Sequence, residues 1–530
     1  MFSPRIRKAI FFLLVISNSG RFAQAQQRGV PPFIITIDAK AKAQTIQNIG
    51  ASGCWYSEGI GKNWPTEKKE HIAELLFSRK VDKAGNPKGI GLSAWRFNIG
   101  GGTAEQGEAS GIRDPNRRAE SFLSPDGTYD WSKQSGYVWF LKKAKEYGVE
   151  ELIAFSNTPP VQFTKNGLGF KTTKDYLANL KPEKYEAFAD FLTEVIAHFD
   201  KEGLHFSYIS PVNEPQWDWS GVVGAAKQEG SPWTNGEIYG VVKALDASLK
   251  QKRLQTKILA PEAAKLTFLF EDKTAASRQI QNFYADTSKL NFKNFTTVPR
   301  LVAGHSYFTD EGDATIITTR RALAQTARKH NVNFWQSEYS MLGDGYKEGS
   351  KEKRTQMDCA LFLAKIIHHD FTVANATAWH LWNAYEPGKA DFDTRYYLIA
   401  LQPEPGLGNG NYTVTKNLWG LGHYSLFIRP GMQRLHIKRS DNLGDLEAAQ
   451  KTMVSAYTDT KGKLVVVAIN YTSSAQPVAL NLRNTGKFKT VQTYTTTADP
   501  DENLKATVVK DVKEGFTLPA RSIMTIVLNP

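Results

Sequence analysis

The sequence predicts an α/β protein, namely a (β/α)8 barrel followed by an antiparallel β-sandwich that also takes an N-terminal strand. Three observations predict this class. The chain has 530 residues, too many for one small core. From residue 46 onward, short apolar strand-like runs alternate with helical periodicity. Beyond residue 428 the helical periodicity fades and short β runs replace it.

The first 25 residues have the pattern of a secretory signal peptide. Arg5, Arg7 and Lys8 precede an apolar run over residues 9–16, and a small-x-small cleavage site follows at residues 23–25. The apolar run is too short to anchor the chain in a bilayer. We therefore expect a secreted or periplasmic protein without stable membrane insertion.

Residues 46–428 show the alternation of a barrel. Residues 26–45 precede it and contain a strand-like run that we expect to join the sandwich. Eight barrel strands are predicted at 47–55, 92–99, 151–156, 208–212, 257–260, 301–307, 333–338 and 376–382. Helices are predicted between them at 66–78, 135–147, 182–199, 236–250 and 314–329. Eight such units over roughly 370 residues fit a barrel with inserted loops.

A doubly wound open sheet is the alternative to the barrel. It is disfavoured because no Gly-x-Gly-x-x-Gly motif opens a helix after the first strand. Residues 429–530 form the sandwich segment, in which alternating apolar residues indicate strands with one buried face. The strands are predicted at 453–457, 464–470, 478–482, 490–496 and 522–528.

Charge and composition exclude several partners. The formal net charge is +13, but the basic residues are spread along the chain, so we expect no nucleic-acid binding. No Cys/His cluster has the spacing of a zinc site, and we expect neither a metal nor another cofactor. We expect a monomer.

Two glutamates stand where apolar strands end. Glu214 lies in Asn213-Glu214-Pro215 after the strand at 208–212, and Glu338 ends the strand at 333–338. In such barrels the chemistry takes place at the carboxyl ends of the strands. A pair of carboxylates raised on strand ends is what cleavage of a glycosidic bond by an acid and a nucleophile requires.

Other strands also end in polar or aromatic residues. Polar groups at the end of a buried strand are costly to leave unpaired, so they should bind one another or a ligand. These candidates are Arg96, Asn98, Asn157, His305, Tyr307, Trp379 and Trp382.

The two glutamate motifs resemble those of clan A glycoside hydrolases. The layout of a barrel followed by a sandwich that borrows an N-terminal strand resembles glycoside hydrolase family 30, over nearly the full mature chain. Supporting stretches lie at residues 50–53, 95–98, 156–160, 164–167 and 228–232.

The resemblance implies a retaining double displacement on a polysaccharide or oligosaccharide. Glu214 would be the general acid/base and Glu338 the nucleophile. Asn213 would bind the 2-hydroxyl of the sugar, while Arg96 and Tyr307 would orient Glu338.

The resemblance also implies further substrate-binding residues. Trp379 or Trp382 would form the floor under the sugar, and the choice between them stays open. Asn157 and His305 complete the polar set. A non-catalytic carbohydrate-binding protein is the alternative from another class, but it would have lost one of the two carboxylates.

The finer substrate prediction depends on loop resemblance. Residues 96–105 and 55–58 look most like the endo-β-1,6-galactanase branch, which would act on the side chains of arabinogalactan. Asn98, Glu58 and Glu105 are then the nearest candidates to bind the axial 4-hydroxyl of galactose. A β-1,6-glucanase, a xylanase and a glucosylceramidase of the same family remain alternatives.

Overall fold

The computed structural model describes residues 32–389, 395–510 and 512–530. The predicted signal peptide at 1–25 lies outside these residues. Eight parallel strands form one sheet in the order β6-β5-β4-β3-β2-β9-β8-β7, which confirms the predicted barrel. They are β2 (Asn48–Ser52), β3 (Ala94–Asn98), β4 (Glu151–Phe155), β5 (Phe206–Ser210), β6 (Lys257–Ile258), β7 (Leu301–His305), β8 (Asn333–Glu338) and β9 (Ala378–Leu381).

Backbone hydrogen bonds close the sheet between β6 and β7. The N–H of Ala303 donates to the carbonyl of Ala260 at 3.1 Å, and the N–H of Ala263 donates to the carbonyl of Ala303 at 3.2 Å. Every residue of β2, β3 and β7 is buried, as expected for parallel strands with both faces covered. Closure brings all eight carboxyl ends to one rim.

Helices surround the barrel, and the five predicted ones are confirmed with ends shifted by three residues or fewer. Two of the helices, α6 and α10, begin with capping boxes built by Thr234 with Glu237 and by Thr355 with Asp358. The predicted helices are α2 (Thr66–Phe77), α4 (Ser135–Glu146), α5 (Tyr185–Lys201), α6 (Asn235–Gln251) and α9 (Asp313–Lys329). The others are α1 (Ser57–Asn63), α3 (Thr103–Gln106), α7 (Leu266–Phe270), α8 (Gln279–Tyr284), α10 (Gln356–Thr372), α11 (Lys416–Ser425) and α12 (Asp445–Ala449).

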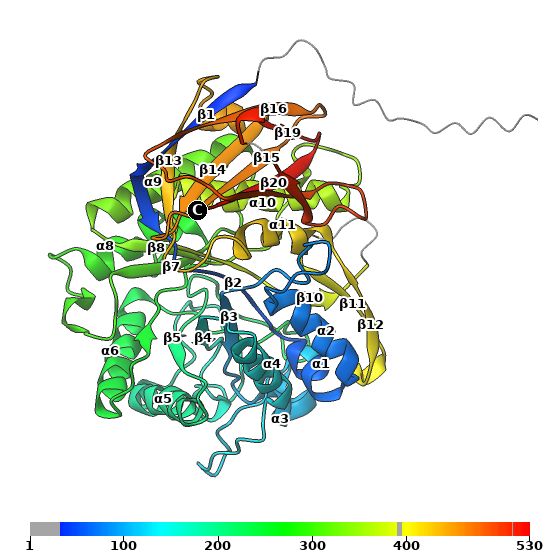
Figure 1. Ribbon diagram of the computed structural model, residues 1–530. Coiled ribbons are helices and arrows are strands. Elements are labelled where there is room, and N and C mark those ends of the chain that lie inside the picture. The colour runs from blue at the N-terminus through cyan, green and yellow to red at the C-terminus, as the bar shows by residue number, and fades with distance from the viewer. Residues whose placement is uncertain (1–31, 390–394, 511) are drawn as a thin grey trace, which may run out of the picture.

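The second sheet has nine strands in the order β18-β17-β20-β15-β14-β13-β1-β16-β19. The N-terminal strand β1 pairs antiparallel with β13 and parallel with β16, so it joins the C-terminal sandwich as predicted (Figure 1). The other strand pairings of this sheet are antiparallel. Its strands are β1 (Phe33–Thr45), β13 (Gln433–Arg439), β14 (Thr452–Thr458), β15 (Leu464–Asn470), β16 (Gln476–Arg483), β17 (Thr490–Thr496), β18 (Lys505–Val509), β19 (Phe516–Leu518) and β20 (Ser522–Asn529).

Several strands were missing from the sequence prediction. β18 has no fully buried residue and β19 has only three residues, so neither shows a clear alternating pattern. A separate sheet of three strands also lies after β9. It comprises β10 (Tyr385–Pro387), β11 (Ile399–Pro403) and β12 (Gly410–Val414).

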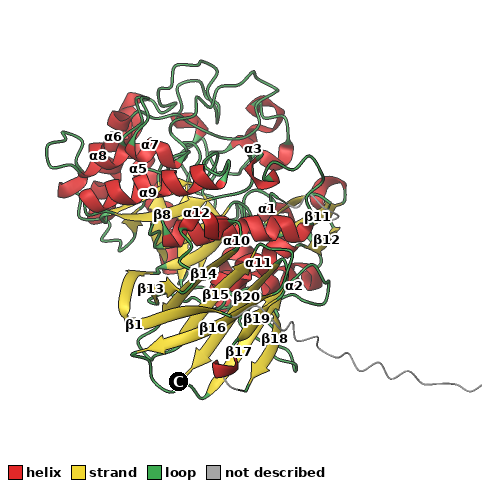
Figure 2. Cartoon of the chain, turned by 90° about the horizontal axis from the view of Figure 1, so that it is seen from above, coloured by secondary structure: helices red, strands yellow, loops and turns green. Residues whose placement is uncertain are grey.

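The barrel and the sandwich meet along α10 and α11 (Figure 2). The buried ring of His423 on α11 lies between the hydroxyls of Thr525 and Thr496, each at 2.9 Å. The predicted boundary at 428/429 falls between α11 and β13 and stays a prediction. None of the helices in the described part of the chain is both long and apolar enough to cross a bilayer.

Candidate active site

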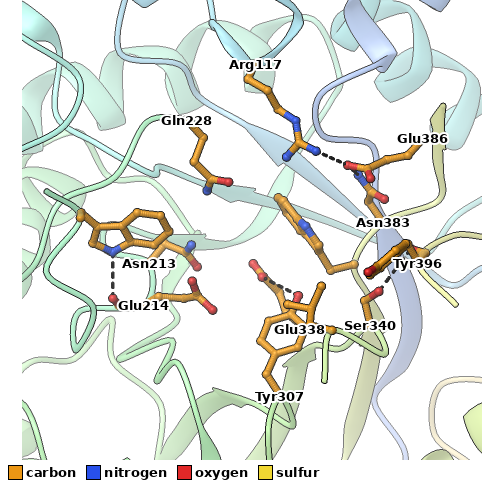
Figure 3. Close-up of a pocket in the computed structure, with 13 residues that line it drawn as sticks. Arg117, Asn213, Glu214, Gln228, Tyr307, Glu338, Ser340, Asn383, Glu386 and Tyr396 are labelled. Atoms are coloured by element: carbon orange, nitrogen blue, oxygen red, sulfur yellow. Dashed lines mark hydrogen bonds and ion pairs between the residues drawn. The ribbon is translucent and has the colours of Figure 1, made fainter. Parts of the chain in front are cut away.

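A cavity of about 320 Å³ opens at the carboxyl ends of the barrel strands (Figure 3). Five of the sequence-predicted residues line it, which are Asn213, Glu214, Tyr307, Glu338 and Trp382. Further lining residues lie outside the eight barrel strands, namely Arg117, Trp219, Gln228, Ser340, Leu342, Asn383, Glu386 and Tyr396.

Glu214 is held by the loop that follows β5. Its backbone has a φ of +44°, a left-handed conformation that is uncommon outside glycine and often marks functional positions. Its N–H donates to the carbonyl of Glu262 at 3.0 Å, and its own carbonyl accepts from the indole of Trp219 at 3.0 Å. These bonds turn the carboxylate toward the cavity.

Glu338 is the last residue of β8 and is only 2% exposed. The guanidinium of Arg96 donates from Nη1 to Oε1 at 2.6 Å, and the hydroxyl of Tyr307 donates to Oε2 at 3.4 Å. Burial raises the pKa of Glu338, whereas the positive charges of His305 and Arg96 act against that increase. The sequence expectation that Arg96 and Tyr307 lie against Glu338 agrees with these contacts.

His305 joins the two glutamates. Its Nδ1 lies 3.0 Å from Oε1 of Glu214 and 3.5 Å from Oε2 of Glu338, and its Nε2 lies 3.3 Å from Oε2 of Glu262. Burial alone would lower the pKa of His305, but the surrounding carboxylates, Glu338 first, raise it to about 10. The ring is therefore a cation at neutral pH and donates from both nitrogens.

Glu262 is a third carboxylate, fully buried behind the cavity, that sequence reasoning missed. It accepts hydrogen bonds from Ser210 at 2.6 Å and from Ser337, and it lies 3.4 Å from Nη2 of Arg96. Burial would raise its pKa, but Arg96, His305 and the serine hydroxyl together lower it to about 2. The sequence did hold a signal for this residue, because Glu262 comes two residues after the end of the strand predicted at 257–260, and active-site residues gather at strand ends.

The carboxylates of Glu214 and Glu338 face each other across the cavity. A carboxylate oxygen of each and a ring nitrogen of His305 all lie within 4.8 Å of one another. Carboxyl groups about 5–5.5 Å apart are typical of retaining glycosidases, whereas inverting enzymes keep them about 6.5–9.5 Å apart. The closeness of the two carboxylate oxygens favours the shorter of these arrangements.

The same three residues have the spacing of a metal site, which corrects the expectation that no such cluster faces the cleft. A metal ligand must be unprotonated. The carboxylates keep His305 protonated, and Arg96 already pairs with Glu338. These two cations oppose a metal ion at this position.

Three asparagines form a chain from the cavity wall into the barrel. Nδ2 of Asn213 donates to Oδ1 of Asn157 at 3.1 Å, and Nδ2 of Asn157 donates to Oδ1 of Asn98 at 3.3 Å. Among the three, Asn213 lines the cavity, and Asn157 and Asn98 support it from behind.

The structure separates the two tryptophans between which the sequence could not choose. Trp382 lines the cavity and meets Trp55 edge to face, with ring centroids 5.2 Å apart. Trp379 is fully buried and donates from its indole to Asp370 at 2.9 Å. Trp382 is therefore the tryptophan that a bound sugar can reach.

Glu58 and Glu105 point away from the cavity. The carboxylate of Glu58 accepts from the backbone N–H of Gly136 at 3.0 Å, at the start of α4. That of Glu105 accepts from the N–H of Ser121 at 3.1 Å. Neither lines the cavity.

A group of three polar side chains lies in the cavity wall. Arg117 pairs with Glu386 at 2.9 Å and stacks over the ring of Trp55 at 3.9 Å, and Asn383 donates to Glu386 at 3.2 Å. Figure 3 shows this group on the opposite side of the cavity from Glu214. Sequence reasoning missed Arg117 and Glu386 because both lie outside the barrel strands.

A barrel that presents two closely spaced carboxylates to a cavity at its strand ends defines a glycoside hydrolase. The profile of O-glycosyl hydrolase family 30 matches residues 32–393. The chain belongs to glycoside hydrolase family 30, and its substrate is a carbohydrate.

Individual relatives are similar over almost the whole chain. Glucuronoxylanase XynC of Bacillus subtilis (strain 168) is 23% identical over 543 residues, covering 99% of both chains. A conserved exported protein from Bacteroides fragilis is 36% identical with a TM-score of 0.86, covering 93% of this chain and all of that one. The catalytic domain of xylanase C from Talaromyces cellulolyticus shares the fold at 19% identity and a TM-score of 0.65, covering 94% of this chain and all of that one.

Proposed function

We propose that the protein hydrolyses β-glycosidic bonds with retention, with Glu338 as the nucleophile and Glu214 as the general acid/base. The observation that carries this proposal is the short separation of the two carboxylates, within 4.8 Å at their nearest oxygens. Their surroundings also differ. Glu338 ends a barrel strand and is paired with the guanidinium of Arg96, whereas Glu214 lies in a loop and accepts a hydrogen bond from His305.

In the first step, Glu338 attacks the anomeric carbon and Glu214 gives its proton to the glycosidic oxygen. The C–O bond to the leaving sugar breaks as the bond to Glu338 forms, which produces a glycosyl-enzyme. Arg96 and Tyr307 hold the attacking carboxylate in position through their contacts with its two oxygens. Asn213 binds the 2-hydroxyl, an interaction that strengthens in the transition state.

In the second step, Glu214, now ionised, removes a proton from a water molecule that attacks the same carbon. The bond to Glu338 breaks, and the sugar leaves with its β configuration restored, because two inversions have taken place. Trp382 lies beside both carboxylates in the cavity wall and provides the apolar floor under the ring.

For the substrate we propose β-1,6-linked galactan, as in the side chains of arabinogalactan. The loop at residues 96–105 supports this branch of the family. Galactose differs from glucose at the axial 4-hydroxyl, and discrimination needs a buried polar partner for that group. Arg117, Glu386 and Asn383 offer such donors and an acceptor in place of Glu58 and Glu105.

Xylan is the second candidate substrate, because a relative that aligns with 99% of this chain is named a glucuronoxylanase. We further propose that the protein is an exported monomer, with the sandwich starting near residue 429. The N-terminal signal pattern and the likeness to a conserved exported protein support the export.

The experiment for the substrate is a comparison of kcat/KM on β-1,6-galactan, β-1,6-glucan and glucuronoxylan, scored by new reducing ends. We expect the fastest turnover on galactan. Faster turnover of either other polymer would move the substrate assignment to that polymer and leave the catalytic pair unaffected. Glu386→Gln should reduce the preference for galactan over glucan, since it weakens the acceptor for the 4-hydroxyl.

A further inference from the structure

An exposed aromatic side chain stands beside the catalytic cavity. Phe308 is 46% exposed and directly follows Tyr307, which lines the cavity. Its backbone has a φ of +53°, a conformation that is costly for a bulky residue. Strained positions of this kind persist where the surrounding structure imposes them, and they gather at functional sites. Burial in the core does not explain this phenylalanine.

Trp217 holds Phe308 in place from the side of Glu214. Their ring centroids lie 6.2 Å apart with an interplanar angle of 83°, and Trp217 makes a similar perpendicular contact with Phe268 at 6.2 Å and 86°. The backbone N–H of Trp217 donates to the carbonyl of Glu214 at 3.2 Å. We call Trp217 and Phe308 the aromatic rim. The backbone turn from Glu214 to Trp217 holds this rim close to the proposed acid/base residue.

The apolar surface continues from the rim into the cavity. Leu342, which is 41% exposed, lines the cavity, and the ring of Phe308 lies near Gly343, the next residue. The polar group of Arg117, Glu386 and Asn383 lies on the other side of the cavity from Glu214 (Figure 3). The polar group thus faces Glu214 across the cavity, whereas the aromatic rim lies beside the cavity and is attached to the Glu214 side.

We infer that the aromatic rim binds the sugar on the leaving-group side of the cleaved bond, so that the enzyme cleaves within chains. This inference rests on the proposed roles of Glu214 and Glu338. The acid must reach the glycosidic oxygen, so the leaving sugar lies on the side of Glu214. The apolar face of a sugar ring stacks on an aromatic ring. Contacts on both sides of the cleaved bond favour internal segments of a polymer over its ends.

The test separates leaving-group contacts from the rest of catalysis. kcat/KM is measured on a polymer and on a β-glycosyl fluoride of the matching disaccharide, whose leaving group has no ring to stack. Phe308→Asn removes the aromatic ring but keeps a residue that tolerates a left-handed backbone. We expect about a tenfold loss on the polymer, the scale of one lost aromatic contact, with the fluoride within about twofold of wild type.

Two controls accompany this variant. Phe308→Tyr keeps the ring and should remain close to wild type on both substrates. Val508→Asn also replaces an exposed apolar side chain by asparagine, but on β18 in the sandwich, where Val508 is 73% exposed. It should alter neither rate. An equal loss on both substrates would place Phe308 in the binding of the other sugar or in folding, and an unchanged polymer rate would remove it from binding. Either result overturns the inference.

The polymer in this test is the one that the wild type hydrolyses fastest among galactan, glucan and xylan. A wrong substrate proposal therefore appears in the wild-type rates, whereas a wrong rim proposal appears in the ratio between polymer and fluoride for Phe308→Asn. A wild type that hydrolyses none of the three would overturn both.

Discussion

At the carboxyl ends of the barrel strands, four ionisable side chains lie together with at most 2% exposure each, namely Arg96, Glu262, His305 and Glu338. The core of the sandwich is just as well buried, but it consists of hydrophobic side chains such as Ile35, Val466 and Ile526. One region buries charge and the other buries apolar surface.

The difference shows what each region contributes. Burial of apolar side chains stabilises the sandwich by about 25 cal/mol per Å² removed from water. Buried ion pairs often contribute little net stability, because desolvation offsets the attraction, yet removal of one partner is strongly destabilising. The contacts in the barrel centre keep its charges paired, and in the proposed mechanism these charges serve the reaction. Substitutions in the two regions should accordingly separate activity from stability.

The largest effects are expected at the catalytic pair. Glu214→Gln should lower kcat by about 10²–10⁴-fold, the usual contribution of a general acid, and Glu338→Gln by at least as much. Glu214→Ala should regain activity on substrates with good leaving groups, which need no proton. Thermal unfolding of Glu214→Gln should stay close to wild type, whereas Glu338→Gln should also lower the stability, because Arg96 loses a buried partner. Near-normal kcat in either variant would contradict the assignment.

Glu262→Gln should affect both the stability and the pKa of a neighbouring site residue. It removes one of the buried carboxylates that face Arg96 and His305, so we expect a loss of about 3–5 kcal/mol in the free energy of unfolding. The pKa of His305 should also fall, because one of the carboxylates that raise it is gone. Denaturant unfolding and an NMR titration of the His305 ring measure the two changes. Glu183→Gln, at an exposed position, is the matched control, and equal stability of the two variants would refute this role of Glu262.

His305 predicts a pH dependence of stability. Its pKa is about 6.5 in an unfolded chain and about 10 in the fold. The stability that the protonated ring provides is therefore complete below about pH 6.5 and is lost as the pH rises toward 10. The melting temperature of His305→Gln should lie below that of the wild type near pH 6, and the two should converge as the pH rises toward 10. Parallel curves would contradict the raised pKa.

Ile526→Val in the sandwich core should have the smallest effect and should act on stability alone. Deletion of one buried methylene costs about 0.5–1.5 kcal/mol of unfolding free energy. Ile526 lies on β20, in the core of the other domain, so kcat/KM measured well below the melting temperature should equal that of the wild type. A changed kcat/KM would show that the sandwich influences the catalytic cavity.

The sequence predicted the elements whose signal is local. Most of the barrel strands are short and largely apolar, and Glu338 ends one of them while Glu214 closely follows another. Trp379 and Trp382 are three residues apart, so their side chains point to opposite faces of an extended chain. The alternation of side chains along a strand does not tell which of the two faces the sugar. That choice needed the closed barrel.

The remaining site residues depend on long-range contacts. Glu262 follows β6, which has only two residues, and its φ of +55° turns it back beneath Arg96. Arg117 and Glu386 lie far apart in the sequence, on a short 3-10 helix and on β10, and their ion pair brings them together. Glu58 was predicted near the sugar from the loop resemblance, whereas its carboxylate binds the backbone at the start of α4.

The central claim is that Glu338 and Glu214 act in a double displacement. Proton NMR of the first product released tests it most directly, before mutarotation mixes the anomers. Two inversions predict that the new reducing end appears first as the β-anomer. The α-anomer appearing first would show a single inversion and would contradict the roles assigned to both glutamates.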